Sequence, residues 1–198
     1  MEAEQHPLQP FLPANARLLM LGSFPPQRKR WSMAFYYPNF NNDMWRIMGL
    51  VFFDNKDYFV DTAHKTFRLP ALERFLAERG IALYDTATVV RRLNDNASDK
   101  FLEVVEATDV VALLRRLPQC TAVAVTGQKA CDTLCALFGI AEPGVGSYTE
   151  FTSEGRAMRL YRMPSTSRAY PLKMEKKAEA YRAMMRDVFV TATPSPGA

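Results

Sequence analysis

Histidine and cysteine are scarce in this sequence of 198 residues, which has two histidines and three cysteines. His6 in the N-terminal segment and His64 in a predicted loop do not suit a histidine-based metal site or histidine acid–base catalysis in the core. Three cysteines supply neither a disulfide framework nor the four thiolates of an iron–sulfur cluster. Cys131 and Cys135 are interpreted as core packing on a buried helix. We expect no bound metal and a reducing, cytoplasmic location.

Long apolar runs are also absent. No stretch approaches the roughly 20 residues needed to span a bilayer, so a membrane partner is not expected. The N-terminal segment contains Glu2 and Glu4 but no apolar core of a signal peptide. We expect one domain over 1–198, with flexible tails at 1–14 and 191–198.

Several familiar nucleotide-binding and hydrolase motifs are missing. The sequence has no Walker A loop, no Gly-x-Gly-x-x-Gly after a strand and no Gly-x-Ser-x-Gly elbow. Lys and Arg total 25 against 21 for Asp and Glu, which gives a net charge of +4. This mildly basic balance permits a nucleic-acid partner without indicating one.

The apolar pattern alternates short strands with helices. Buried strands are expected at 17–22 and 121–127, and residues 81–90 are interpreted as a strand that runs out into a loop. Two more strands are expected between 146 and 164, with a turn at 153–155. Helices are expected at 43–53, 70–79, 109–117, 128–138 and 172–190. This order predicts an α/β protein with three layers, α/β/α, around a central, mostly parallel four-stranded sheet.

Three of the predicted strands end in polar segments. These segments are Gly22–Pro26, Tyr84–Thr86 and Pro164–Ser167. In open α/β sheets, sites form at the carboxyl ends of the strands. The sequence therefore predicts a site where these three segments meet.

Polar residues before the first helix have two interpretations. Asn39, Asn41 and Asn42 suit helix capping, and an Asn amide can also hold a water or polarise a substrate. The run Arg28–Arg30 is typical of a solvated loop, although with Tyr36 it also suits phosphate contact and base stacking.

Two further candidates lie at strand ends. Asp85 is either a surface or capping residue or a buried carboxylate that accepts a hydrogen bond from a bound heterocycle. Ser165, Thr166 and Ser167 form either an ordinary turn or a phosphate-binding loop.

Four segments, in this order, resemble the uracil-DNA glycosylase superfamily over about residues 17–190, closest to its hypoxanthine-DNA glycosylase branch. Gly22-Ser-Phe-Pro-Pro26 resembles the first motif of the superfamily. Residues 36–45, Tyr-Tyr-Pro-Asn-Phe-Asn-Asn-Asp-Met-Trp, resemble the Tyr-Tyr-x-His-Pro-x-Asn-x-Phe-Trp segment of that branch. Met163-Pro-Ser-Thr-Ser167 resembles its Leu-Pro-Ser-Thr-Ser motif. Thr126-Gly-Gln-Lys-Ala130 is similar to the Asn-Gly-Lys-x-Ala stretch at a strand–helix junction.

The resemblance implies a mismatch-specific uracil glycosylase-like fold and a monofunctional DNA glycosylase of base excision repair, which acts on uracil or hypoxanthine. The damaged base would be flipped from DNA, and its N-glycosidic bond hydrolysed without metal or cofactor. Gly22, Ser23, Phe24, Tyr37 and Asp85 would bind the base. Tyr37 would stack on it, and backbone N–H groups near Ser23 and Phe24 would stabilise its negative charge.

Other roles follow from the same resemblance. Asn42 would position the attacking water. DNA would be contacted by Ser165, Thr166, Ser167, Arg168 and Tyr170, and by the basic loop residues Arg28 and Arg30. The loop after Ser167 would enter the duplex as the base leaves. One flipped base needs one pocket, so a monomer with no protein partner is expected.

The sequence departs from the superfamily at three places. Phe24 stands where the main branches carry a water-activating Asp or Asn, Met163 replaces a histidine, and Asn39-Phe40 replaces His-Pro. An alternative is therefore a DNA-lesion-binding protein with little or no catalysis. A third hypothesis is a binding protein for free nucleobases or nucleotides, which would not need the basic loops and would lack salt-sensitive DNA binding.

Overall fold

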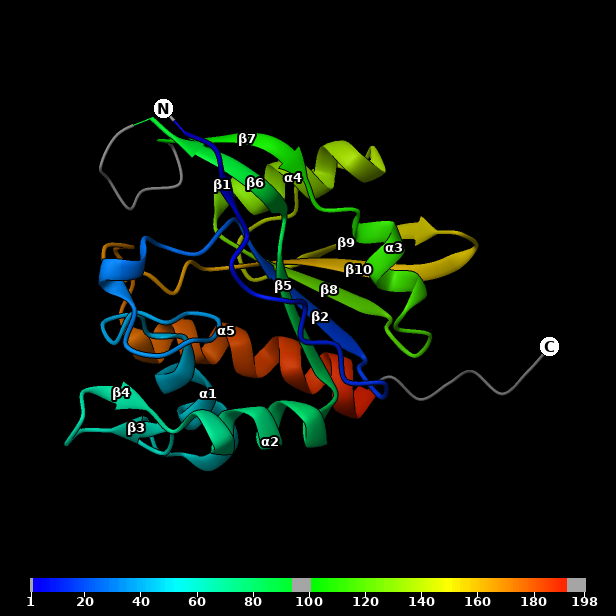
Figure 1. Ribbon diagram of the computed structural model, residues 1–198. Helices are drawn as coiled ribbons and strands as arrows, with labels where there is room; N and C mark the ends of the chain where they lie inside the picture. Colours follow the sequence, from blue (N-terminus) through cyan, green and yellow to red (C-terminus); the bar gives the residue numbers. More distant parts are fainter. Residues whose placement is uncertain (1, 94–100, 192–198) are drawn as a thin grey trace.

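The computed structural model describes residues 2–93 and 101–191. Its centre is a sheet of five strands in the order β5-β2-β8-β10-β9 (Figure 1). The strands are β2 (Leu18–Gly22), β5 (Ile81–Asp85), β8 (Ala122–Thr126), β9 (Tyr148–Ser153) and β10 (Arg156–Met163). The first four in spatial order are parallel, and β9 is antiparallel to β10. The mostly parallel sheet is confirmed, but the predicted count of four strands is wrong, because both strands expected between 146 and 164 join the central sheet as β10 and β9.

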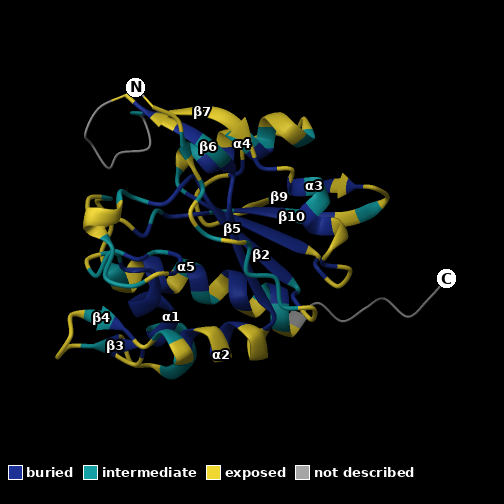
Figure 2. Ribbon diagram, in the orientation of Figure 1, coloured by how far each residue is buried: buried dark blue, intermediate teal, exposed yellow. Residues whose placement is uncertain are grey.

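The middle of this sheet is covered on both faces. Every residue of β2, β5 and β8 is buried, as Figure 2 shows by colour. Continuous apolar runs suit strands that are enclosed by helices on each side. The helices are α1 (Met44–Phe53), α2 (Leu69–Arg79), α3 (Val110–Arg115), α4 (Gln128–Phe138) and α5 (Met174–Arg186). Helices α1, α2 and α5 lie on one side of the sheet, and α3 and α4 lie on the other (Figure 1).

Local sequence accounts for most helix ends. Pro70 lies in the first turn of α2, and Gly80 ends the helix in the left-handed conformation with φ 71°. Gly139 ends α4 in the same way, with φ 62°. The last helix begins at Met174 rather than at 172, and it continues as a π-helical turn over Asp187–Thr191.

A second, smaller sheet forms where a strand was expected to run out into a loop. The segment 81–90 holds two strands instead, because the chain leaves the central sheet after Asp85 and starts β6 (Ala87–Arg92). Strand β6 pairs with β7 (Leu102–Ala107) and with β1 (Glu4–Gln5) in the order β1-β6-β7. A third sheet is a two-stranded pair of β3 (Val60–Asp61) and β4 (Thr66–Phe67).

The N-terminal segment is held in place, in contrast to the flexible tail expected at 1–14. Strand β1 pairs with β6, and the N–H of His6 donates to the carbonyl of Thr88 at 2.8 Å. Phe11 and Leu83 exchange two backbone hydrogen bonds of 3.0 and 2.9 Å. Backbone pairing to residues about 80 positions away therefore fixes this segment. In the other expected tail, 192–198 lie outside the described residues.

The cysteines pack as expected from the sequence. Cys120 and Cys131 are buried, and Cys135 is partly buried. Burial raises the pKa of the Cys131 thiol to about 12, so the thiol is a core group rather than a reactive thiolate. Over the described ranges, no helix combines the length and apolarity that a membrane crossing requires.

Candidate functional site

A cavity of about 200 Å³ opens at the carboxyl ends of the central strands. At ~30 Å³ per molecule, this space would hold about seven waters, the scale of one small heterocycle. Most of the predicted site residues line it: Gly22, Ser23, Phe24, Arg30, Tyr37, Asn42, Asp85, Ser165, Thr166 and Ser167. The expectation that the polar strand ends meet in one place is therefore confirmed.

Gly22 and Asp85 lie side by side at the ends of β2 and β5. A Cβ added to Gly22 would lie 2.5 Å from Oδ1 of Asp85, closer than a real contact allows. The Gly22 carbonyl accepts from the N–H of Thr86 at 2.8 Å, and the Asp85 carbonyl accepts from the Thr108 hydroxyl at 2.7 Å. Glycine at position 22 thus lets the carboxylate lie directly against the backbone at the cavity wall.

The Asp85 carboxylate is buried and has a histidine partner. Nε2 of His6 lies 2.8 Å from its Oδ2, and the two side chains are 2% and 9% exposed. Burial, followed by the charge of Asp85, raises the pKa of the neighbouring Tyr36 phenol well above its ordinary value of 10. The Tyr36 hydroxyl therefore remains a neutral donor, and it donates to the Gln9 carbonyl at 2.7 Å.

Tyr37 has a strained backbone at the cavity wall. Its φ is 49°, a left-handed value that is rare for a bulky residue and costs about 1–3 kcal/mol. Its hydroxyl lies 3.1 Å from Oγ1 of Thr126, and its ring packs edge-on to Trp45 at 5.9 Å. These contacts fix the ring at the cavity wall.

Asn42 lines the cavity and also bonds to the first residue of helix α1. Its Oδ1 accepts from the N–H of Met44 at 2.9 Å, and its own N–H donates to the Asn39 carbonyl at 2.8 Å. Asn39 also contributes Oδ1, which accepts from the N–H of Asn41 at 2.9 Å. An amide oxygen has two lone pairs, so the bond from Met44 uses one of the two that Asn42 offers. The structure shows this bond at the start of the helix, and the water-positioning role stays a prediction.

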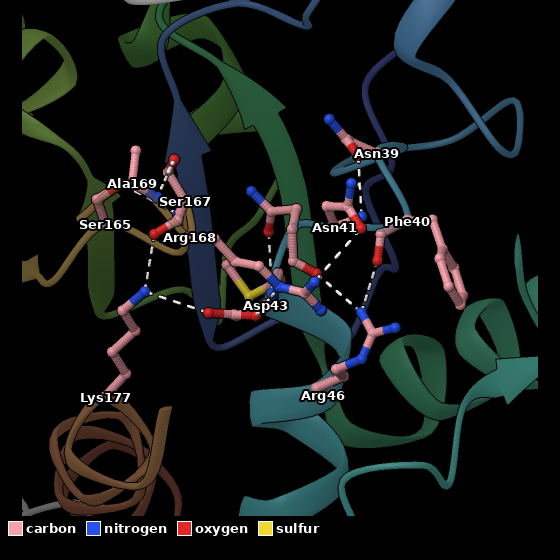
Figure 3. A network of polar contacts seen from close by, with 12 residues as sticks. Asn39, Phe40, Asn41, Asp43, Arg46, Ser165, Ser167, Arg168, Ala169 and Lys177 are labelled. Atoms are coloured by element: carbon pink, nitrogen blue, oxygen red, sulfur yellow. Dashed lines mark hydrogen bonds and ion pairs between the residues drawn. The ribbon is translucent and has the colours of Figure 1, made fainter. Parts of the chain in front are cut away.

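A buried ion pair joins the two loops that flank the cavity (Figure 3). Nζ of Lys177 lies 3.2 Å from Oδ2 of Asp43 and donates to the Ser167 carbonyl at 2.8 Å. Lys177 and Asp43 are 1% and 4% exposed. The N–H of Asp43 donates to the Thr166 carbonyl at 2.9 Å. This set of bonds holds the loop that carries Asn42 against the serine loop.

Three predicted DNA-contacting residues lie outside the cavity lining. Nε of Arg168 lies 3.3 Å from Oδ1 of Asp43, so this guanidinium folds back onto the loop network. The Tyr170 ring centre lies 5.8 Å from Nζ of Lys177. Arg28 lies in an exposed 3-10 turn with its guanidinium 4.1 Å over the Trp31 ring. The structure therefore places these residues on the surface around the cavity.

The turn after β2 is anchored to the small sheet. The Phe24 ring packs with Ala87, Val90 and Leu102 in a separate apolar cluster. Arg92 is 9% exposed, and its Nη2 donates to the Pro25 carbonyl at 2.7 Å. A phenylalanine at position 24 therefore packs against the small sheet.

Comparison with solved structures identifies a shared fold. The chain resembles the solution NMR structure of a candidate uracil DNA glycosylase from Methanosarcina acetivorans, with a TM-score of 0.61. The match has 20% sequence identity and covers 94% of this chain and 99% of that chain. No protein-family model and no curated protein matches the chain. The likeness supports the mixed α/β fold expected from the sequence motifs.

Sequence reasoning missed several residues at the site. His6, Arg92 and the Asp43–Lys177 pair are all brought in by contacts between segments 67 to 134 residues apart. No local spacing could indicate such contacts. Thr126 was also missed, but a local signal for it exists, because it lies at the end of a predicted strand on the same sheet edge. Among the described residues, no group of three or more His, Cys, Asp or Glu side chains could hold a metal ion.

Proposed function

We propose that this protein is a DNA glycosylase that hydrolyses the N-glycosidic bond of uracil or hypoxanthine flipped out of DNA. The observation that carries the proposal is the single cavity formed by the segments 22–26, 36–42 and 165–167. These are the segments whose residues resemble motifs of the uracil-DNA glycosylase superfamily. The fold shared with the Methanosarcina acetivorans protein is a second, weaker support.

The cavity walls supply the contacts that a flipped base requires. Tyr37 offers an aromatic ring for stacking, which contributes about 1–3 kcal/mol per base. Asp85 offers a carboxylate oxygen that can accept a hydrogen bond from the base edge. Both side chains are fixed by neighbours, Thr126 in one case and His6 in the other. The pocket is thus formed before the base arrives, which lowers the cost of binding.

Cleavage of the N-glycosidic bond creates negative charge on the base and positive charge on the sugar. We expect separate groups to stabilise each charge. The leaving base gains negative charge, which the backbone N–H groups near Ser23 and Phe24 would stabilise. The sugar becomes oxocarbenium-like, and the DNA phosphates next to it would stabilise its positive charge. Asn42 would hold the attacking water through the second lone pair of its amide oxygen. The proton of that water would leave to solvent as the new C–O bond forms.

DNA would bind across the mouth of the cavity. Arg30 lines the cavity, and Arg28 and Arg168 lie exposed around it. Ser165 and Ser167 are accessible for phosphate contact, whereas Thr166 is only 3% exposed and serves the loop through its carbonyl group. Phosphate contacts release counterions, so affinity should fall steeply with salt.

A second candidate function is lesion binding with little catalysis. The capping bond from the N–H of Met44 to Asn42 favours it, since the oxygen proposed to hold water already has a partner. Phe24, at the position where related enzymes activate water, is packed among apolar side chains. This candidate requires the same cavity and the same DNA surface but no rate enhancement.

An excision assay separates the candidates. Labelled duplexes and single strands that carry uracil, hypoxanthine, xanthine or a thymine mismatch are incubated with the protein and then cut at abasic sites with hot alkali. Cutting at uracil or hypoxanthine is the expected result. Binding in a mobility-shift assay without cutting at any lesion would support lesion binding instead. Binding that is insensitive to salt would contradict both.

A further inference from the structure

His6 stands out because its side chain is buried beside the cavity residue Asp85 and takes part in no chemical step described above. Its imidazole is 2% exposed and lies among aromatic rings, with centroid distances of 4.6 Å to Tyr84, 5.2 Å to Phe24 and 6.3 Å to Tyr36. Its backbone N–H is fixed to Thr88 beside strand β1. Three aromatic rings and the backbone bond to Thr88 therefore hold the imidazole in one orientation.

The contact between His6 and Asp85 indicates which ring nitrogen of His6 carries a proton. Nε2 lies 2.8 Å from Oδ2 of Asp85, and a carboxylate oxygen can only accept, so Nε2 carries hydrogen. Nδ1 lies 3.0 Å from the carbonyl oxygen of Leu8 and 3.1 Å from the backbone nitrogen of the same residue. Both ring nitrogens thus have polar partners, and Nε2 is the donor to the carboxylate.

We infer that His6 is a positioning residue that makes Asp85 a dedicated reader of a ring N–H on the bound base. The hydrogen bond to Oδ2 fixes the plane of the carboxylate. Oδ1 then lies against Gly22 at the cavity wall, where a Cβ would come within 2.5 Å of it. The inference deepens the proposed function and rests on it.

An acceptor held at that wall selects bases by simple chemistry. Uracil and hypoxanthine carry an N–H in the ring, at the edge that pairs in DNA. Cytosine and adenine carry a lone pair at the matching ring nitrogen, which a carboxylate oxygen repels. A site built to hydrogen-bond an N–H rejects the analogue that lacks it by about 10⁴-fold or more. Deaminated bases would be accepted and their normal parents rejected because His6 prevents Asp85 from turning.

Three variants test the inference. His6→Ala removes the donor, and His6→Gln supplies an amide N–H that can replace it. His64→Ala is the matched control, because His64 forms an equal 2.8 Å contact with Asp61 on the surface, with its side chain 78% exposed. The ratio of kcat/KM for uracil to that for cytosine is measured on single-stranded oligonucleotides. The ratio should fall about ten- to hundredfold in His6→Ala, recover in His6→Gln and stay unchanged in His64→Ala.

Two measurements do not depend on catalysis. One is the NMR signals of the His6 ring nitrogens, and the other is the binding of the free bases. In ¹⁵N-histidine NMR, His6 should show a protonated Nε2, and Asp85→Asn should shift the Nε2 signal. Free uracil should perturb wild-type spectra more than free cytosine does, and His6→Ala should narrow that difference.

The outcomes separate the two ideas. A wild type that excises no base refutes the proposed function, while free-base titration still decides the inference about His6. An unchanged uracil preference in His6→Ala, an Nε2 without a proton, or equal binding of uracil and cytosine by the wild type would each overturn that inference.

Discussion

Replacing Lys177 with methionine tests whether the buried ion pair holds the cavity loops together. Methionine keeps the apolar stem of the side chain but removes the ammonium group that faces Asp43 at 3.2 Å and Ser167 at 2.8 Å. Asp43, only 4% exposed, would then depend on Arg168 alone, at 3.3 Å. A buried carboxylate that loses one partner is strongly destabilised because water cannot replace that partner.

The expected loss follows from burial. Breaking one side of a buried pair costs about 3–5 kcal/mol, and the remaining contact to Arg168 favours the lower end. In a domain of this size, 1 kcal/mol shifts Tm by about 2–4 °C, so Tm should fall by ~6–20 °C. Thermal unfolding followed by circular dichroism measures this directly.

Lys176→Met is the matched control. Lys176 is the preceding residue of the same helix, and its ion pair with Glu179 is exposed, with side chains 62% and 59% accessible. Such surface pairs contribute about 0–1 kcal/mol. The double variant Asp43→Asn with Lys177→Met should recover part of the loss, since no buried charge is then left unpaired. A Tm for Lys177→Met no lower than that of Lys176→Met would refute the reasoning.

Three further predictions concern the cavity and the core. Gly22→Ala should lower kcat/KM for uracil excision about a hundredfold, because the new Cβ displaces Asp85; unchanged kinetics would remove Asp85 from base reading. Asn42→Ala should lower the excision rate by orders of magnitude while DNA binding is retained. Asn42→Ser keeps an oxygen for the N–H of Met44, so it should lose activity at near-normal stability. Activity in either variant would exclude the water-positioning role. Burial raises the pKa of Tyr161 from 10 to about 12. The neutral phenol therefore stabilises the fold fully below pH 10 and loses this contribution as pH rises to 12. Tyr161→Phe should flatten the fall in unfolding free energy over that window in urea titrations, and an equally steep fall would contradict the assignment.

The sequence predicts those parts of the fold that depend on local patterns. Strands β2 and β8 and helix α4 occupy the predicted segments within one residue at each end, because apolar runs and flanking glycines define them. The hairpin of β9 and β10 is also predicted, through the turn at residues 153–155. Periodicity alone is sufficient where an element forms the centre of the core.

Elements that depend on distant partners were not predictable in this way. The polar residues Asp85 and Thr86 indicate the end of β5, but nothing local indicates that the chain then enters a second sheet. Strand β7 has one buried residue in six and thus lacks a core pattern. The two residues of β1 are polar and become a strand only through pairing with β6.

The residues of the candidate site also fall into two groups, those with a local sequence signal and those that depend on distant partners. Gly22, Tyr37 and Asp85 were found because they end strands or belong to recognisable motifs. His6 looked like part of a polar N-terminal tail, and its role depends on a partner 79 residues away. Lys177 lies in the predicted helix 172–190, and no local pattern indicates that its side chain is buried. A charged residue on a helix shows its burial only when the opposite loop is placed.

The central claim is tested most directly by identifying what the protein releases from DNA. Duplexes with one uracil or one hypoxanthine are incubated with the wild type, and the small-molecule fraction is analysed by mass spectrometry. The account predicts the intact free base in solution and an abasic site left in an unbroken strand. Release of a nucleotide, or no released base while the protein binds the same duplex, would contradict it.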